Sequence, residues 1–309
     1  MLQHGACLAG PDSAMVDCRM HVFIGKIFLA FAALGAGVNL LAEPSPPSNI
    51  ILSSGVPGGG YWNAGDRIKE VAMSELGLSV ENVASRGSRD NLQKLLDVNS
   101  PVSLAFAQAD VAQYYLNTRG PGAVNQLELI ENVGEECVFI ITGKKRDIRD
   151  EADLEEAESL RLGIASADSG IAATFDYMSS RLTGLLDISV RYGNTLPLMK
   201  QLNDPGAPVD AVMTVHRPRE LSPEVEYALS HPSDYRFVEL DGDRLPQKLW
   251  YGGKVYRSMQ LAMPGLEEPV NTICVLGLLL ANKYKLTLAQ RNRISELADY
   301  HWMKVYVTR

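Results

Sequence analysis

Several residue types are scarce in this sequence, and each shortage argues against a class of protein. Its 309 residues include only four cysteines and five histidines, too few for a disulfide framework in a chain of this size. Basic residues are outnumbered, with 29 Lys and Arg against 37 Asp and Glu and a net charge of −8. That balance argues against a nucleic-acid partner, which requires a basic surface. It leaves an anionic small ligand open, because a local site can oppose the net charge.

The remaining composition is that of an ordinary globular protein. Hydrophobic residues make up 46% of the chain and charged residues 21%, which suits a sizeable core. At roughly 100–200 residues per domain, the length fits one large domain or two lobes.

The N-terminal stretch predicts an exported protein. An uncharged apolar run at residues 27–38 follows Lys26 and precedes a small residue, Ala42. This run is shorter than the roughly 20 residues that a spanning helix needs. We therefore expect residues 1–42 to be a signal peptide cleaved after Ala42, with 43–48 as a linker and the mature protein in the periplasm. An uncleaved anchor is the alternative. Translation from Met15 or Met20 would remove upstream residues that do not suit a signal peptide.

Two cysteines remain in the mature chain, Cys137 and Cys274, each within an apolar run. We interpret them as two buried thiols. A disulfide between them, in an oxidising compartment, is the less favoured alternative.

Strand-like and helix-like segments alternate along the mature chain, which predicts α/β units with parallel strands. Among the helices, we expect one to end at Gly77, one to be capped by Ser88, one to run from Ser169, and one to begin at a capping box of Thr287 and Gln290. Apolar runs typical of strands occupy residues 50–53, 78–84, 102–107, 136–142, 160–164, 188–192, 209–214 and 270–280.

The α/β pattern restarts after a charged segment, and this predicts two lobes. We expect residues 49–142 to form the first part of lobe I, 143–240 to form lobe II, and 241–309 to return to lobe I with the C-terminal helix. The chain would cross between lobes near residues 142–144 and near Val270, and these two crossings would form a hinge.

Three loops share one design, in which a strand ends, a Gly or Ser loop follows and a helix begins. They are centred on Gly58-Gly59-Gly60-Tyr61, Arg86-Gly87-Ser88 and Asp168-Ser169-Gly170. Helix N-termini present unpaired N–H groups with positive partial charge, and they bind carboxylates or phosphates. The alternative is ordinary capping and turn chemistry.

Catalytic and cofactor motifs are missing from the sequence. The glycines match neither the dinucleotide fingerprint nor the phosphate loop, and no nucleophile elbow is present. The mature histidines, which lack metal-ligand spacing, are interpreted as loop residues at His216 and His231, with His301 near the end. Glu135-Glu136 and Glu155-Glu156 are interpreted as solvated faces. We therefore expect no enzyme, no metal and no cofactor.

The motifs resemble those of the TAXI family, the extracytoplasmic solute-binding proteins of TRAP-type transporters. The similarity spans roughly residues 49–305 and departs from the family at Arg86 and Ile171. It is carried by Gly58-Gly59-Gly60-Tyr61-Trp62, Gly87-Ser88-x-x-Asn91-Leu92-x-x-Leu95, Leu104-Ala105-x-x-Gln108-x-Asp110-Val111, the loop at Asp168-Ser169-Gly170, and Tyr251-x-Gly253-x-x-Tyr256.

This resemblance implies a periplasmic-binding-protein fold of the second type, with two α/β lobes, a central cleft and no cofactor. It implies a monomer that captures a small carboxylate and delivers it to TRAP-type membrane components. A sensor subunit for a membrane kinase and a secreted enzyme on the same fold are the alternatives. The expected ligand-binding residues are Gly59, Gly60, Tyr61, Arg86, Gly87, Ser88, Asn91, Gln108, Asp110, Ser169, Gly170 and Thr174.

Two of these expectations concern particular side chains. We expect Ser88 and Ser169 to donate hydrogen bonds to the ligand from facing lobes. Arg86 or Arg89 could add a bidentate partner for a carboxylate, although a solvated surface charge is the favoured interpretation of Arg89.

Overall fold

The computed structural model describes residues 49–218, 220–245 and 247–299. The expected signal peptide, linker and His301 lie outside the described residues. Within those ranges, no helix is both long enough and apolar enough to cross a membrane.

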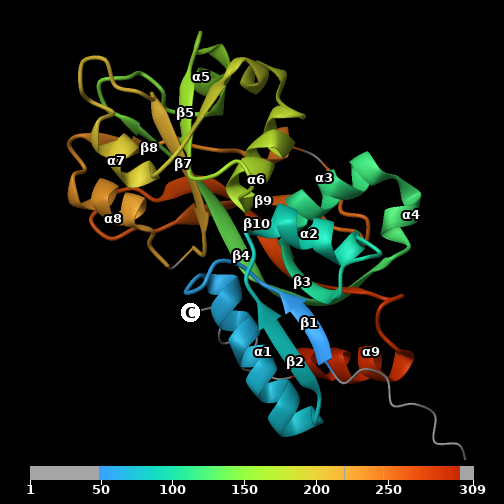
Figure 1. The fold of residues 1–309 in the computed structure, drawn as a ribbon. Coiled ribbons are helices and arrows are strands. Elements are labelled where there is room, and N and C mark those ends of the chain that lie inside the picture. Colours follow the sequence, from blue (N-terminus) through green and yellow to red (C-terminus); the bar gives the residue numbers. More distant parts are fainter. Residues whose placement is uncertain (1–48, 219, 246, 300–309) are drawn as a thin grey trace, which may run out of the picture. The chain divides into compact units, whose positions relative to one another are not determined.

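One mixed sheet organises the described residues, with strand order β2-β1-β3-β10-β4-β7-β5-β6 (Figure 1). Strand β8 pairs with β4, and β9 pairs with β10. The strands are β1 (Asn49–Ser53), β2 (Ser79–Val83), β3 (Val102–Gln108), β4 (Leu127–Gly143), β5 (Arg161–Ile164), β6 (Ser189–Tyr192), β7 (Ala211–His216), β8 (Tyr235–Phe237), β9 (Tyr256–Leu261) and β10 (Val270–Asn282).

Helices connect most of these strands, so the expected α/β class is confirmed. The α-helices are α1 (Gly60–Leu76), α2 (Ser88–Leu96), α3 (Ala109–Arg119), α4 (Pro121–Val124), α5 (Glu151–Glu156), α6 (Gly170–Ser179), α7 (Thr195–Lys200), α8 (Pro223–Ser230) and α9 (Leu288–Ser295). Short 3-10 helices lie at η1 (Thr183–Asp187), η2 (Gly242–Arg244) and η3 (Glu296–Asp299).

The long antiparallel strands β4 and β10 join two parallel groups of strands. One group is β2-β1-β3, and its β3 pairs with residues 277–281 of β10. The other is β7-β5-β6, and its β7 pairs with residues 137–142 of β4. Strand β10 pairs with β9 over residues 270–275 and with β3 over residues 277–281, and β4 gains β7 as its outer partner from residue 137 onward. Both long strands therefore run through both halves of the sheet (Figure 1).

The strand pairing does not fix the boundaries of the two expected lobes. The described residues group as one compact unit, so the boundaries near residues 142 and 240 stay predictions. The change of partners favours crossings earlier in β4 and later in β10 than residues 142–144 and Val270.

Helix α1 shows how the sequence pattern produces the packing. Ile68, Val71, Ala72 and Leu76 recur at helical spacing, which predicts one apolar face. Val71 is partly buried, and the other three are buried in one cluster with strands β1 and β3. Gly77 ends the helix in the left-handed conformation with φ 58°, which costs glycine little because it has no Cβ.

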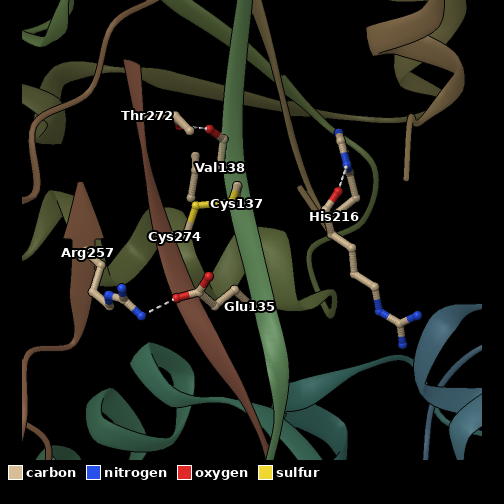
Figure 2. Close-up of a disulfide and its surroundings, with 8 residues drawn as sticks. Glu135, Cys137, Val138, His216, Arg257, Thr272 and Cys274 are labelled. Carbon is tan, nitrogen blue, oxygen red and sulfur yellow. Dashed lines mark hydrogen bonds and ion pairs between the residues drawn. A yellow bond between two sulfur atoms is a disulfide. The ribbon is translucent and has the colours of Figure 1, made fainter. Parts of the chain in front are cut away.

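The two cysteines form a disulfide, so the interpretation as buried thiols was wrong. Cys137 and Cys274 are direct cross-strand partners on β4 and β10, with Cα atoms 3.9 Å apart. Figure 2 shows the bond between the two strands, beside the hydrogen bond from the Thr272 hydroxyl to the Val138 carbonyl. The sequence separation of 137 residues hid this juxtaposition, because it follows from long-range strand pairing.

Local expectations at helix starts were partly correct. Ser169 caps α6, and the Thr287–Gln290 capping box at α9 is confirmed. Ser88 does not cap α2, because Gly87 occupies the N-cap with φ 120° and Ser88 is the first helical residue. Strand β4 begins at Leu127, well before the expected start at residue 136.

Candidate functional site

The starts of α1, α2 and α6 meet around one cavity of about 260 Å³. Nine of the twelve expected site residues line it. They are Gly59, Gly60, Tyr61, Arg86, Gly87, Ser88, Gln108, Ser169 and Gly170. The other lining residues are Gly55, Val56, Trp62, Glu136, Ile171, Val215, His216, Arg217 and Glu220.

The first turn of α1 lies against an arginine. Gly59 occupies the N-cap of α1 and provides no side-chain cap. A Cβ added to Gly60 would lie 3.3 Å from Arg217 Nη2, so the guanidinium group sits beside the start of this helix. Helix N–H groups and a planar guanidinium both bind carboxylates, and here the two lie side by side.

The starts of α2 and α6 touch each other directly. A Cβ on Gly87 would lie 3.2 Å from the Gly170 nitrogen, and a Cβ on Gly170 would lie 2.0 Å from Gln108 Oε1. Glycine at both positions therefore permits the contact. Because Gly87 follows β2 and Gly170 follows β5, the contact joins the two halves of the sheet on one side of the cavity.

The serine hydroxyls already have partners within the protein. Ser88 Oγ donates to Gln108 Oε1 at 3.3 Å and accepts from the backbone N–H of Gln108 at 3.1 Å. Ser169 Oγ donates to the Ser166 carbonyl and accepts from the Ala172 nitrogen. Ser169 thus fits the capping alternative, and donation by these hydroxyls to a ligand stays a prediction.

Arg86, in the loop before α2, and Arg89, in the first turn of α2, make ion pairs across the same contact. Arg86 Nη1 lies 2.7 Å from Asp168 Oδ2, and Nη2 lies 3.4 Å from Asp90 Oδ1. Arg89 pairs with Asp176 of α6 and retains 28% of its side-chain exposure, so the interpretation of Arg89 as a solvated charge was wrong. These ion pairs connect the start of α2 with α6 and with the loop that precedes α6.

Three expected site residues lie outside the cavity lining. Asn91 is fully buried and bridges β1 and β3, donating to the Ser54 and Phe106 carbonyls. Asp110 is fully buried and accepts from the Tyr256 hydroxyl at 2.7 Å. Thr174 is fully buried and accepts from Gln108 Nε2 at 3.3 Å. Through these bonds, only Thr174 contacts a residue of the cavity lining, Gln108.

The charged lining residues of β4 and of the loop after β7 were missed. Glu136, read as a solvated face, is half-buried and lines the cavity, while Arg217 is buried and donates to Glu220 Oε1 at 2.9 Å. A signal for Arg217 was available, because it directly follows strand β7, and ligands bind beyond the carboxyl ends of strands. Glu136 depends on strand pairing, which its apolar neighbours do not reveal.

Other charged or histidine assignments also change. His216 is not a loop residue, since it ends β7 and stacks on Phe139 with ring centroids 4.4 Å apart. His231 lies just after α8, outside helix and strand, as expected of a loop residue, and it stacks on Tyr227. Glu155 pairs with Arg244, so it is not simply a solvated face.

Burial governs the proton affinities in and around the cavity. It raises the pKa of Glu136 to about 7, against the lowering influence of Tyr61 and Arg217. Burial raises the pKa of Tyr61 well above its usual value, and the Glu136 charge adds to this. Burial also raises the pKa of Asp110 and lowers that of His216. The cavity therefore disfavours an ionised side chain that has no oppositely charged or hydrogen-bonding partner.

A second cavity, of about 520 Å³, lies apart from the first and shares none of its lining residues. Glu151, Asp241, Glu239, Asp150 and Arg244 are among its lining residues, so its wall is mainly acidic. The residues of the described ranges include no cluster of His, Cys, Asp and Glu that could hold a metal ion.

Comparisons with known proteins give only distant structural similarity. No protein-family profile and no curated protein matches this chain. XAC2383 from Xanthomonas citri, solved bound to ATP, is 10% identical with a TM-score of 0.48 over 81% of this chain and 82% of its own. The periplasmic binding protein BugD is 15% identical with a TM-score of 0.47, over 85% and 86%.

The periplasmic aliphatic sulphonate binding protein SsuA from Escherichia coli is 14% identical with a TM-score of 0.46, over 84% of this chain and 71% of its own. The TM-scores of these three structures lie below 0.5.

Proposed function

We propose that this protein is a periplasmic solute-binding protein that holds a small carboxylate in the cavity between the two halves of its sheet. The carboxylate would accept hydrogen bonds from the first N–H groups of α1 and from Arg217. The cavity volume of about 260 Å³ suits a small acid, because drug-sized ligands occupy sites of roughly 300–1,000 Å³.

One observation carries this proposal: the start of α1 and the buried Arg217 come from opposite halves of the sheet and lie against each other at one cavity. A ligand bound there contacts both halves. It would therefore favour the arrangement in which the halves are closed, because only that arrangement supplies both sets of donors.

The disulfide supports export from the cytoplasm. Structural disulfides persist in oxidising compartments such as the bacterial periplasm and are rare in reducing ones. The bond between Cys137 and Cys274 is buried and ties β4 to β10, so its formation belongs to the folded protein. This agrees with the signal peptide expected at residues 1–42.

We further propose delivery to the membrane components of a TRAP-type transporter, as the resemblance to the TAXI family implies. A sensor subunit for a membrane kinase would use the same cavity and the same closure. Pull-down of detergent-solubilised membrane proteins by the ligand-loaded protein separates these partners.

Calorimetry with succinate, malonate and 2-oxoglutarate tests the binding proposal. We expect at least one acid to bind, and Arg217→Met to weaken that binding about tenfold or more, since hydrogen bonds to charged groups contribute about 1.5–3 kcal/mol. Arg257→Met is the matched control, because Arg257 is 64% exposed on β9 and pairs with Glu135. Equal affinity in the Arg217 variant and the wild type would refute the site.

A further inference from the structure

The cavity that we propose for an anion is also lined by a carboxyl group, that of Glu136, whose negative charge would oppose anion binding. Glu136 lies on β4 next to the disulfide, just before the residues that pair with β7, and it pairs with Val275 of β10. It lines the same cavity as the start of α1 and Arg217. A negative charge at Glu136 would repel a bound carboxylate, because few water molecules screen charges in a half-buried site.

The cations of the cavity already have carboxylate partners other than Glu136. Arg217 Nη1 donates to Glu220 Oε1 at 2.9 Å, and Arg86 pairs with Asp168 and Asp90. Glu136 takes part in no ion pair among the described residues. The two carboxylates and two arginines that line the cavity leave it without net positive charge for an anion.

The groups that face Glu136 come from every side of the cavity. Tyr61 of α1 stacks on Phe106, and its hydroxyl lies over Gly277, where a Cβ would be 3.1 Å away. That hydroxyl oxygen is buried and has no hydrogen-bond partner within the described ranges. Arg217 lowers the pKa of Glu136, whereas Asp110 of α3 and Glu220 raise it. His216, the remaining titratable residue of the lining, is held neutral by burial, which lowers its pKa.

We propose that Glu136 takes up one proton from solvent when the carboxylate binds and, as a neutral acid, donates a hydrogen bond to that carboxylate. This inference rests on the proposed function. The proton moves from solvent to the Glu136 carboxylate, no other bond forms or breaks, and the O–H group replaces a repulsive charge with a donor. Glu136 is then a specificity-determining residue, because the site discriminates between anions by the acceptor that meets this donor.

The predicted signature is proton uptake on binding. Burial raises the pKa of Glu136 to about 7 in the free protein, so a bound anion that needs the neutral form raises it further. Affinity for the carboxylate should fall by up to about tenfold per pH unit above about pH 7. Below that pH the affinity should be almost constant until the ligand itself becomes protonated.

Calorimetry at pH 8 in phosphate and in Tris, which differ in ionisation enthalpy, counts the protons taken up with succinate, malonate or 2-oxoglutarate. Wild type should take up close to one proton. Glu136→Gln should bind without proton uptake and with little pH dependence, because the amide keeps a donor and carries no charge. Glu220→Gln is the matched control, an acid of the same cavity whose loss should leave proton uptake intact.

The outcomes separate the two proposals. Binding without proton uptake, or unchanged pH dependence in Glu136→Gln, overturns this inference and leaves the proposed function standing. Failure of all three acids to bind at pH 5 and pH 8 overturns both. Carbon-13 NMR of the Glu136 carboxyl group, assigned by comparison with Glu136→Gln, needs no ligand. A midpoint near 7 supports the inference, and one near the usual 4.5 refutes it.

Discussion

Besides Asp110, two carboxyl groups of this protein lie in surroundings that disfavour their charge. Burial raises the pKa of both Glu136 and Glu151 to about 7. Glu151, at the start of α5, is only 3% exposed, and its nearest cation, Arg244 Nη1, is 3.6 Å away. Neither residue stands out in the sequence, since isolated glutamates are normally solvated.

These raised pKa values make stability depend on pH in a defined direction. Between about 4.5 and about 7 the folded protein holds protons at these two residues that the unfolded chain has released. Their contribution is therefore complete below about pH 4.5 and is lost as pH rises through about 7. Each pKa unit corresponds to about 1.4 kcal/mol.

Urea unfolding at pH 5 and pH 8 measures this effect. We expect the free energy of unfolding to fall less between the two pH values in Glu151→Gln than in the wild type. Glu156→Gln, on the exposed side of the same short helix, is the control and should behave like the wild type. An unchanged pH dependence in Glu151→Gln would mean that Glu151 titrates normally.

Among the helices and strands, the sequence predicted those that can be recognised from the residue pattern of the segment itself. Uninterrupted apolar runs predicted most strands, and the stripe of Ile68, Ala72 and Leu76 predicted the buried face of α1. The first half of β4 was missed, because residues 127–135 mix acidic and apolar residues without a clear strand pattern. The glycine loops predicted the helix starts around the cavity. Glu136 depends on strand pairing across the sheet, whereas Arg217 was missed although it directly follows the apolar strand β7.

The contact between α2 and α6 depends on a missing Cβ. In Gly170→Ala the methyl group would lie 2.0 Å from Gln108 Oε1 and 3.2 Å from Ser88 Oγ at the start of α2. Both side chains are buried, so we expect the start of α6 to move away from that of α2. We expect small-angle scattering, with a saturating carboxylate, to give a larger radius of gyration than for the wild type. Gly193→Ala is the control, since nothing lies within 4 Å of its added Cβ. Equal radii for Gly170→Ala and the wild type would show that the contact adapts without opening.

The disulfide joins the two strands that run through both halves of the sheet. Its loop of 137 residues is long, so the bond removes much conformational freedom from the unfolded chain. We expect Cys137→Ala/Cys274→Ala to lower the free energy of unfolding by about 2–5 kcal/mol. Urea unfolding of the wild type with and without a phosphine reductant is the companion measurement. Identical unfolding curves for the oxidised wild type and the double variant would contradict this role.

At the scale of the whole molecule, two α/β halves share two long strands, and helix starts from both halves enclose one small cavity. In the proposed function, a ligand that contacts both halves would stabilise a closed form, and a membrane partner would distinguish loaded from empty protein by that difference. The ion pairs of Arg86 and Arg89 also join the two halves, and exposed pairs contribute only about 0–1 kcal/mol each.

The most direct test of this account is a crystal structure of the protein with the carboxylate that binds most tightly in calorimetry. The account predicts the carboxylate group of that ligand within hydrogen-bond distance of the first N–H groups of α1 and of Arg217, with Glu136 facing it. A ligand found instead in the acidic cavity beside Glu151 and Asp241, or bound outside both cavities, would contradict it.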